Sequence, residues 1–296
     1  MTYCVAMRLN AGLVFLSDSR TNAGVDHVGT SRKMSVFERS GERMMVLMTA
    51  GNLSISQSIK QLLSEYTNTD GYSIWTARTM YEAAEIVGDA IRIVHERDAH
   101  ALDKFGIDFN ASMIFGGQIN GEGCRLFQIY SAGNFIESQN ESVYFQIGES
   151  KYGKPIIDRL ITPDTSLNEA AKCALISMDS TLRSNISVGL PLDLLLYEAN
   201  KLSVTRFVTV DEKNQYFKMI RDSWGQQLKR VFDGIDDPVW DAAPETIGNV
   251  LSNTNMHSKP VRVAAPVGAG ADTGAIADHA APLQALAGQM PGQSQP

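Results

Sequence analysis

The first twenty residues limit the fold more than any other part of the sequence. Residues 2–9 and 12–17 are two short runs rich in apolar residues, and they are joined by residues 10–12 (NAG), which are typical of a tight turn. The two runs predict antiparallel strands, and the apolar character of the second indicates a sheet that is buried on at least one face. We expect the first strand to lie at the edge of this sheet, with Thr2 at its start.

Thr2 is a candidate nucleophile because of its place in the chain. An initiator Met before a small residue is normally removed, so Thr2 is expected to carry a hydroxyl and a free α-amine in one residue. A threonine hydroxyl becomes nucleophilic when a base accepts its proton, and an α-amine with a pKa of about 8 suits this task near neutral pH. A threonine at position two is weak evidence by itself, because most such residues have no chemical role.

The sequence that follows strengthens this interpretation. Residues 17–20 (SDSR) end the second predicted strand, a polar loop covers residues 21–24, and residues 31–34 (SRKM) come shortly after it. This succession resembles the N-terminal half of proteasome β-subunits and of the peptidase of the bacterial two-component protease. It most resembles Anbu, a family of bacterial proteasome-like proteins, and the resemblance covers residues 2–235.

The resemblance implies a role for several residues. In proteasome-like enzymes a lysine near the nucleophile pairs with an aspartate at the end of the second strand, and these positions correspond to Lys33 and Asp18. Lys33 would make the Thr2 hydroxyl easier to deprotonate, and Gly51 corresponds to the glycine whose N–H binds the oxyanion. Arg20 also matches a family position. The alternatives are an ordinary surface ion pair for Lys33 and Asp18, and a helix-entry glycine for Gly51.

Two family motifs are altered in this sequence. The glycine-serine motif of the family has Glu149 where serine is usual, and Ser150 follows it. A second motif, an arginine-aspartate pair followed by a serine, has Ser184 where aspartate is usual and keeps Ser187. The resemblance makes Ser150 and Ser187 candidate residues that orient the α-amine, while the two substitutions leave efficient peptidase activity open.

Hydrophobic periodicity predicts strands, two helices, strands, two helices, strands and a final helix. Further strands are expected at residues 25–28, 33–38, 44–49, 111–117, 124–130, 143–148, 187–197 and 205–209, with 111–148 forming a meander. Helices are expected from residue 53 and at 75–102, 154–160, 166–183 and 214–232, and Ser166 and Glu169 have the spacing of a capping box. The absence of a strict βαβ alternation favours an α+β fold. The resemblance narrows this class to the four-layer αββα sandwich of N-terminal-nucleophile hydrolases.

Composition changes along the chain and predicts its domains. With 44% hydrophobic residues in 296, the chain can form one large core, which we expect within residues 2–235. Residues 236–252 are expected to pack on that domain or on a neighbour. From residue 253 the chain is rich in Ala, Gly and Pro with almost no aromatic residues, which predicts a flexible tail at 253–296, with a docking tail for a partner as the alternative.

Charge and composition exclude several classes of partner. The formal net charge is −7 and no basic run occurs, which argues against nucleic acid and acidic lipid surfaces, since both are bound by clustered Lys and Arg. No P-loop sequence is found, so an ATPase partner would be a separate protein. No apolar stretch reaches the roughly 20 residues that cross a bilayer, and the N-terminus does not resemble a signal peptide. These features predict a cytoplasmic protein with no membrane contact.

Metal and cofactor sites are not predicted. Cys4, Cys124 and Cys173 are far apart and lie in apolar runs, which is typical of reduced core cysteines in a cytosolic protein. Among the five histidines only His95 and His100 are near one another, and their spacing of five on a charged helix is typical of a solvated face.

Three functions remain at this stage. The favoured one is a threonine peptidase or amide hydrolase of the proteasome type, which cleaves a peptide or other amide substrate through an acyl-enzyme. The alternatives are a self-assembling scaffold that has lost turnover and an amidohydrolase that does not act on peptides. In each case the resemblance implies self-assembly into a ring or an open spiral.

Overall fold

The computed structural model describes residues 2–23, 27–65 and 71–239. The chain divides into two units, residues 1–236 and 237–296, and the helices and strands of the described residues belong to the first. The predicted extension at 236–252 is therefore described only up to residue 239, and the predicted tail at 253–296 lies outside the described residues. No helix in the described part of the chain combines the length and the apolar character needed to cross a membrane.

One antiparallel sheet contains the N-terminal strand. Its order is β10 (Tyr144–Gly148), β1 (Tyr3–Leu9), β2 (Gly12–Asp18), β11 (Leu192–Glu198) and β12 (Arg206–Val210). The prediction that the first strand lies at the edge is wrong, because β10 pairs with β1 on the side away from β2. The N-terminal strand β1 thus lies between two strands, which restricts how the adjoining Thr2 can move.

The second five-stranded sheet is an antiparallel meander. It consists of β5 (Met34–Arg39), β6 (Arg43–Gly51), β7 (Ala111–Ile119), β8 (Arg125–Ile129) and β9 (Phe135–Glu137). The three-residue β9 was not predicted, and β10, which we expected in this meander, lies in the other sheet. Local periodicity cannot show which sheet β9 or β10 joins, because both strands follow turns and have similar composition.

A separate hairpin of β3 (Arg20–Ala23) and β4 (His27–Thr30) leaves the end of β2. The prediction of a loop at residues 21–24 is wrong over most of its length, because the polar residues of β3 pair with β4. A polar two-stranded ribbon has no apolar alternation that a sequence pattern could detect.

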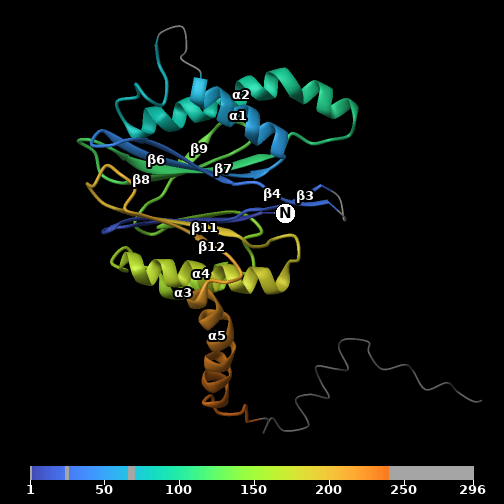
Figure 1. Cartoon of the computed structure of the whole chain (residues 1–296), viewed down its shortest axis with the longest axis vertical. Helices are drawn as coiled ribbons and strands as arrows, with labels where there is room; N and C mark the ends of the chain where they lie inside the picture. Colours follow the sequence, from blue (N-terminus) through green and yellow to red (C-terminus); the bar gives the residue numbers. More distant parts are fainter. Residues whose placement is uncertain (1, 24–26, 66–70, 240–296) are drawn as a thin grey trace, which may run out of the picture. The chain divides into compact units, whose positions relative to one another are not determined.

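Helices cover the outer face of each sheet (Figure 1). The helices α1 (Leu53–Glu65) and α2 (Met80–Lys104) pack on the meander, and α3 (Lys154–Leu160) and α4 (Leu167–Ser184) pack on the sheet that contains β1. A third apolar cluster fills the space between the two sheets. These layers confirm the expected α+β class.

The packing of β2 explains its continuous apolar sequence. Val14 and Leu16 belong to the cluster beneath α3 and α4, whereas Leu13 and Phe15 belong to the cluster between the sheets. Alternate side chains of one strand therefore enter two cores, so both faces must be apolar.

Two boundaries differ from the predictions for identifiable reasons, and one predicted cap is present. The helix α2 begins at Met80 instead of residue 75, because the Thr79 hydroxyl accepts the Glu82 N–H at 3.1 Å as an N-cap. The strand β11 begins after Pro191, which has no N–H to give to a ladder. The capping box of Ser166 and Glu169 is present at the start of α4, as predicted.

Candidate functional site

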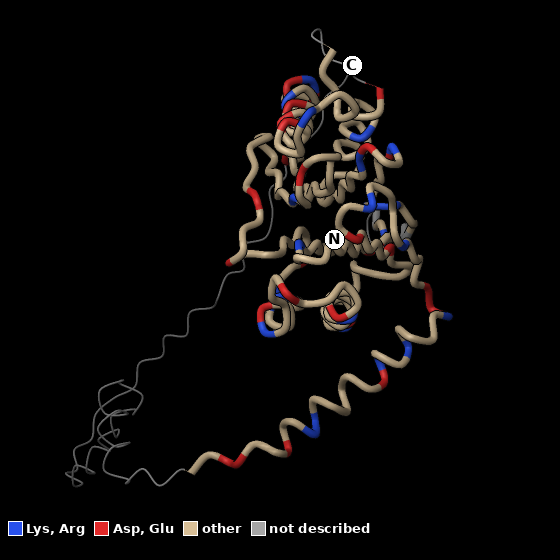
Figure 2. The backbone as a smooth tube through the Cα atoms, turned by 90° about the vertical axis from the view of Figure 1, so that its left-hand side faces the viewer, with Lys and Arg blue, Asp and Glu red and all other residues tan. Residues whose placement is uncertain are grey.

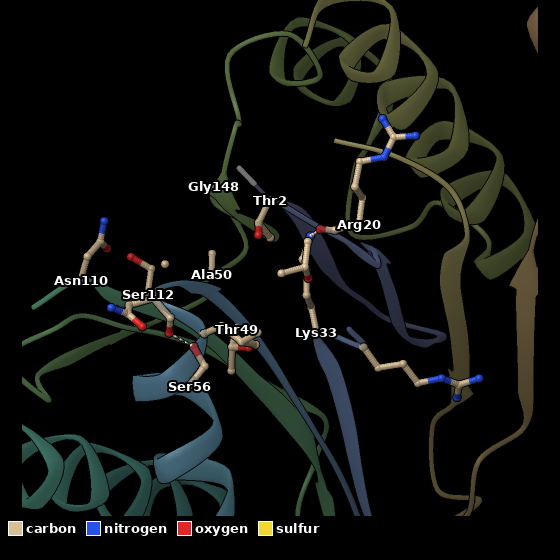
Figure 3. A pocket seen from close by; sticks show the side chains of 14 residues that line it. Thr2, Arg20, Lys33, Thr49, Ala50, Ser56, Asn110, Ser112 and Gly148 are labelled. Atoms are coloured by element: carbon tan, nitrogen blue, oxygen red, sulfur yellow. Dashed lines mark hydrogen bonds between the residues drawn. The ribbon is translucent and has the colours of Figure 1, made fainter. Parts of the chain in front are cut away.

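A cleft of about 650 Å³ opens beside Thr2, at the point where the two sheets meet (Figure 3). Thr2 directly precedes β1, Lys33 directly precedes β5, and Gly51 is the last residue of β6. All three line the cleft, although they are 18 or more residues apart in the sequence. The structure therefore brings together the predicted nucleophile, lysine and oxyanion glycine.

Lys33 is held by a buried carboxylate. Its Nζ lies 2.6 Å from Oδ1 of Asp18 and donates a second hydrogen bond to the Arg20 carbonyl at 2.7 Å. Asp18 is fully buried and Lys33 is nearly so, so the pair is not the exposed ion pair that was the alternative interpretation. Buried pairs of this kind are geometrically fixed, because breaking one leaves an uncompensated charge away from water.

The same carboxylate is tied to the N-terminal strand. Oδ1 of Asp18 accepts the Tyr3 N–H at 3.0 Å, and Oδ2 accepts the Gly189 N–H at 3.4 Å. Burial raises the pKa of the Asp18 carboxyl, while the charge of Lys33 and these hydrogen bonds oppose that shift. Asp18 thus links Lys33 to the residue that follows Thr2.

The turn after β10 fixes the backbone of Thr2. The Thr2 carbonyl accepts the Glu149 N–H at 2.7 Å, and Gly148 adopts a φ of +79°. A Cβ atom on Gly148 would lie 1.9 Å from the Thr2 oxygen, so only glycine permits this approach. The altered motif of the sequence therefore still contacts the candidate nucleophile through its main chain.

Position 51 also requires a glycine. It adopts a φ of +110°, and a Cβ atom there would lie 2.3 Å from the Asn110 carbonyl oxygen. The residue ends β6, and α1 begins two residues later at Leu53. Gly51 is therefore both a helix-entry glycine and a residue of the cleft.

The two altered motifs contact each other. The Asn185 side chain donates from Nδ2 to Oε2 of Glu149 at 2.8 Å and accepts the Ser187 N–H on Oδ1 at 2.9 Å. Glu149 is buried, and Lys151 lies 3.3 Å from its other oxygen. Sequence reasoning identified each substitution but missed Asn185, which connects them.

Ser150 and Ser187 do not line the Thr2 cleft. Ser150 lines a separate cavity together with Tyr144 and Lys154. Ser187 is partly buried and is held by Asn185. Neither serine is therefore among the residues that face a substrate beside Thr2, and Ser184 is exposed.

Two arginines complete the charged part of the cleft, and each also contacts a residue that does not line it. Arg20 donates from Nη1 to the Ile186 carbonyl at 2.9 Å. Arg32 stands 5.5 Å from the centre of the Phe207 ring and 4.0 Å from Asp193. The charged residues that line the described cleft are Arg20, Arg32 and Lys33, all of them basic.

Sequence reasoning missed the polar wall opposite Thr2. Asn52, Asn110 and Ser112 line this side of the cleft, and the close view shows Asn110 and Ser112 across from Thr2 (Figure 3). The pairing of Gly51 with Ala111 in β6 and β7 brings these residues together. No group of His, Cys, Asp and Glu within the described ranges is arranged to hold a metal ion.

Comparisons with known proteins place the chain in a family. No family model and no curated protein matches it. Among solved structures, Anbu (ancestral beta-subunit) from Yersinia bercovieri is 50% identical, with 81% of this chain and 100% of that chain covered and a TM-score of 0.76. A chain from the helical assembly of the Anbu complex from Pseudomonas aeruginosa is 46% identical, with 81% and 99% covered and a TM-score of 0.77. Since nearly the whole of each relative is matched at this identity, the chain belongs to Anbu, a family of proteasome-like proteins.

Proposed function

We propose that this chain, after removal of Met1, is an N-terminal threonine hydrolase that cleaves a peptide or other amide bond with Thr2 as its nucleophile. The observation that carries the proposal is the placement of Thr2 and Gly51 in one cleft with the buried pair of Lys33 and Asp18. Membership of a proteasome-like family supports it. The order of helices, sheet, sheet and helices supports the finer assignment of the four-layer αββα fold of N-terminal-nucleophile hydrolases.

In the proposed acylation, the Thr2 α-amine accepts the hydroxyl proton while Oγ1 bonds to the carbonyl carbon of the substrate. The Lys33 ammonium stabilises the negative charge on the attacking oxygen, and the Gly51 N–H donates to the carbonyl oxygen as it becomes negative. The intermediate collapses when the bond from carbon to nitrogen breaks and the α-amine gives its proton to the leaving nitrogen. The product of this half-reaction is an ester of Thr2.

Deacylation uses the same groups with water as the nucleophile. The α-amine accepts a proton from the water, and the water oxygen bonds to the ester carbon. The bond from that carbon to Oγ1 then breaks, the proton passes to Oγ1, and a carboxylic acid leaves. The cycle restores Thr2 and consumes one water molecule for each amide bond.

Ser150 and Ser187 have positioning roles in this proposal. Ser150 directly follows Glu149, and the Ser187 N–H binds Asn185, which in turn binds the Glu149 carboxylate. The Glu149 N–H binds the Thr2 carbonyl. Loss of either hydroxyl is expected to slow the reaction by an intermediate factor, since neither residue lines the cleft.

A peptide epoxyketone tests the proposal without knowledge of the natural substrate. Its ketone carbon bonds to Oγ1 and its epoxide is opened by the α-amine, so the adduct requires both groups free on one residue. We expect the N-terminal peptide of protein that begins at Thr2 to gain the full inhibitor mass. Thr2→Ser should keep this reaction and Thr2→Ala should lose it. Equal labelling of Thr2→Ala, or labelling of protein that retains Met1, contradicts the assignment.

Self-assembly is the second candidate function. The relative from Pseudomonas aeruginosa forms a helical assembly. We propose that this chain also assembles, as a ring or an open spiral. Glu149 and Ser184 favour a scaffold with little peptidase turnover, and an amidohydrolase for small amides is a further variant. For the amidohydrolase we expect efficient labelling of Thr2 together with slow peptide cleavage. A scaffold that has lost the reaction is not labelled.

The helix α5 (Gln215–Asp233) offers a surface for assembly. Phe217 and Ile220 are buried against the domain and Trp224 is partly buried, whereas every residue from 225 to 239 is exposed. The helix extends away from α3 and α4 (Figure 1). Residues of both charge signs are spread along it (Figure 2). The face that holds the buried residues continues, at spacings of three and four, as two exposed apolar residues of the helix, Leu228 and Val231. An apolar stripe of this kind gains stability when a second surface covers it.

A further inference from the structure

We propose that the Thr2 cleft selects an acyl group with an acidic side chain, so that the bond cleaved follows a glutamyl or aspartyl residue. This inference rests on the proposed hydrolase function and adds the class of substrate. It is carried by the charge of the cleft and by hydrogen-bond donors in its wall that have no partner among the described residues.

The charge of the cleft favours an anion. Its charged lining residues are Arg20, Arg32 and Lys33, and within the described part of the chain no carboxylate lines it. The carboxylates nearest to these cations are Asp18, which is buried on Lys33, and Asp193, which stands 4.0 Å from Arg32. The Arg32 side chain is 64% exposed, so its charge is only weakly compensated. A basic side chain in this cleft would meet cations and no acid.

The wall opposite Thr2 supplies free donors. Oδ1 of Asn52 accepts both the backbone N–H and the hydroxyl of Ser54, at 3.0 and 2.9 Å. This fixes the orientation of the Asn52 amide and leaves its Nδ2 without a partner in the described chain. The side chains of Asn110 and Ser112 likewise make no hydrogen bond to described residues. An apolar side chain placed here would desolvate these groups without replacing their bonds to water.

A carboxylate fits these donors better than a carboxamide does. A carboxylate only accepts hydrogen bonds, and its two oxygens can accept from an amide and a hydroxyl at once. Hydrogen bonds to a charged group are also roughly twice as strong as those between neutral groups. A carboxamide can pair its NH₂ with the amide oxygen of Asn110 or the hydroxyl oxygen of Ser112, but it carries no charge and gains nothing from the cations.

The test uses four peptide epoxyketones that differ only in the residue next to the ketone, which is Glu, Gln, Leu or Lys. The measured quantity is the second-order rate of adduct formation on protein that begins at Thr2. We expect Glu to react about tenfold faster than Gln, because of the stronger charge-assisted bonds, and Lys to be the slowest. Equal rates for Glu and Gln, or a fastest reaction with Leu or Lys, overturn the inference while leaving the hydrolase proposal intact.

A variant of the wall makes the test specific. Asn110→Asp changes no volume and adds one negative charge opposite Thr2, so the ratio of Glu to Gln rates should fall about tenfold and the Lys rate should rise. Asn134→Asp is the matched control, because Asn134 is exposed, does not line the cleft and undergoes the same change. The ratio does not depend on the fraction of active protein. An unchanged ratio in Asn110→Asp overturns the assignment of this wall, and no adduct with any of the four inhibitors overturns the hydrolase proposal as well.

Discussion

Lys33 Nζ and Asp18 Oδ1 lie 2.6 Å apart, and both residues are buried. Oδ1 of Asp18 also accepts the N–H of Tyr3. Lys33 therefore has two separable effects. It compensates a buried carboxylate, and it supplies positive charge beside Thr2. A variant that removes both charges can distinguish the structural effect from the chemical one.

We expect Lys33→Met to lower the free energy of unfolding by about 3 kcal/mol, because a buried carboxylate is left without its cation. It should also slow epoxyketone labelling of Thr2 by a hundredfold or more, on the order of the loss of one electrostatic group at such a site. The double variant Lys33→Met with Asp18→Asn should regain most of the stability and none of the labelling. Recovery of labelling in the double variant would show that Lys33 acts only through the fold. Denaturant unfolding and intact-mass kinetics measure the two effects.

The Asp18 carboxyl gives stability a defined dependence on pH. Its pKa is raised by burial above the ordinary 3.8, so the folded protein holds this proton more tightly than the unfolded chain does. The contribution of Asp18 is fully present below pH 3.8 and is lost as pH rises through the folded-state pKa. The stability of the wild type minus that of Asp18→Asn should therefore decrease from pH 4 towards neutrality. An increase over that range would mean that the charge of Lys33 outweighs burial.

Gly148 tests the contact between the β10 turn and Thr2. Gly148→Ala should cost about 1–2 kcal/mol for a left-handed conformation, and more for the clash with the Thr2 carbonyl at 1.9 Å. Because the clash displaces Thr2, labelling should fall as well. Gly41→Ala is the matched control, since Gly41 has a nearly equal φ of +77° and no atom within 4 Å of an added Cβ. Equal stability losses and unchanged labelling in both variants would show that the contact has no effect on the site.

The sequence predicted the parts of the fold that depend on local pattern. The turn at residues 10–12, the helix α3 and the cap at Ser166 are encoded within a few neighbouring residues. The pairing of β10 with β1 joins segments about 140 residues apart, and no periodicity in either strand specifies the partner. The edge position expected for β1 was wrong for this reason.

The same distinction applies to the site. Resemblance to proteasome subunits pointed to Thr2, Asp18 and Lys33, and the structure places Asp18 against Lys33. The wall opposite Thr2 could not be predicted, because Asn52 and Asn110 become neighbours only through the pairing of β6 with β7. Two polar residues at the end of one strand and at the start of the next are a signal that would have located them.

The hydrogen bond between Glu149 and Asn185 predicts coupling between the two altered motifs. Glu149→Ala and Asn185→Ala should each destabilise the protein, and the double variant should cost less than their sum by about 1–2 kcal/mol, because one charge-assisted bond is lost only once. Labelling of Thr2 should follow the same non-additive pattern, since the Glu149 N–H holds the Thr2 carbonyl. Additive effects on both measurements would mean that the two motifs act independently.

The exposed stripe of α5 predicts how assembly can be disrupted without disturbing the domain. Leu228→Glu places a charge within the stripe, at a residue that is 49% exposed and lies beyond the buried part of the helix. If a second copy covers this face, burying the new carboxylate is costly, and the mass measured by light scattering should shift towards the single chain at micromolar concentration. The melting temperature of the domain should change little, because Phe217 and Ile220 remain buried.

The control for this prediction is Gln226→Glu, which adds the same charge to the same exposed part of α5. A helix advances 100° per residue, so position 226 lies well away from the face formed by residues 220, 224, 228 and 231. Assembly should therefore be retained in Gln226→Glu and lost in Leu228→Glu. Equal weakening in both variants would indicate a general effect of negative charge on α5, and full assembly in Leu228→Glu would mean that the stripe is not the contact. Thr2→Ala should assemble as the wild type does, because the cleft and α5 are separate features of the domain.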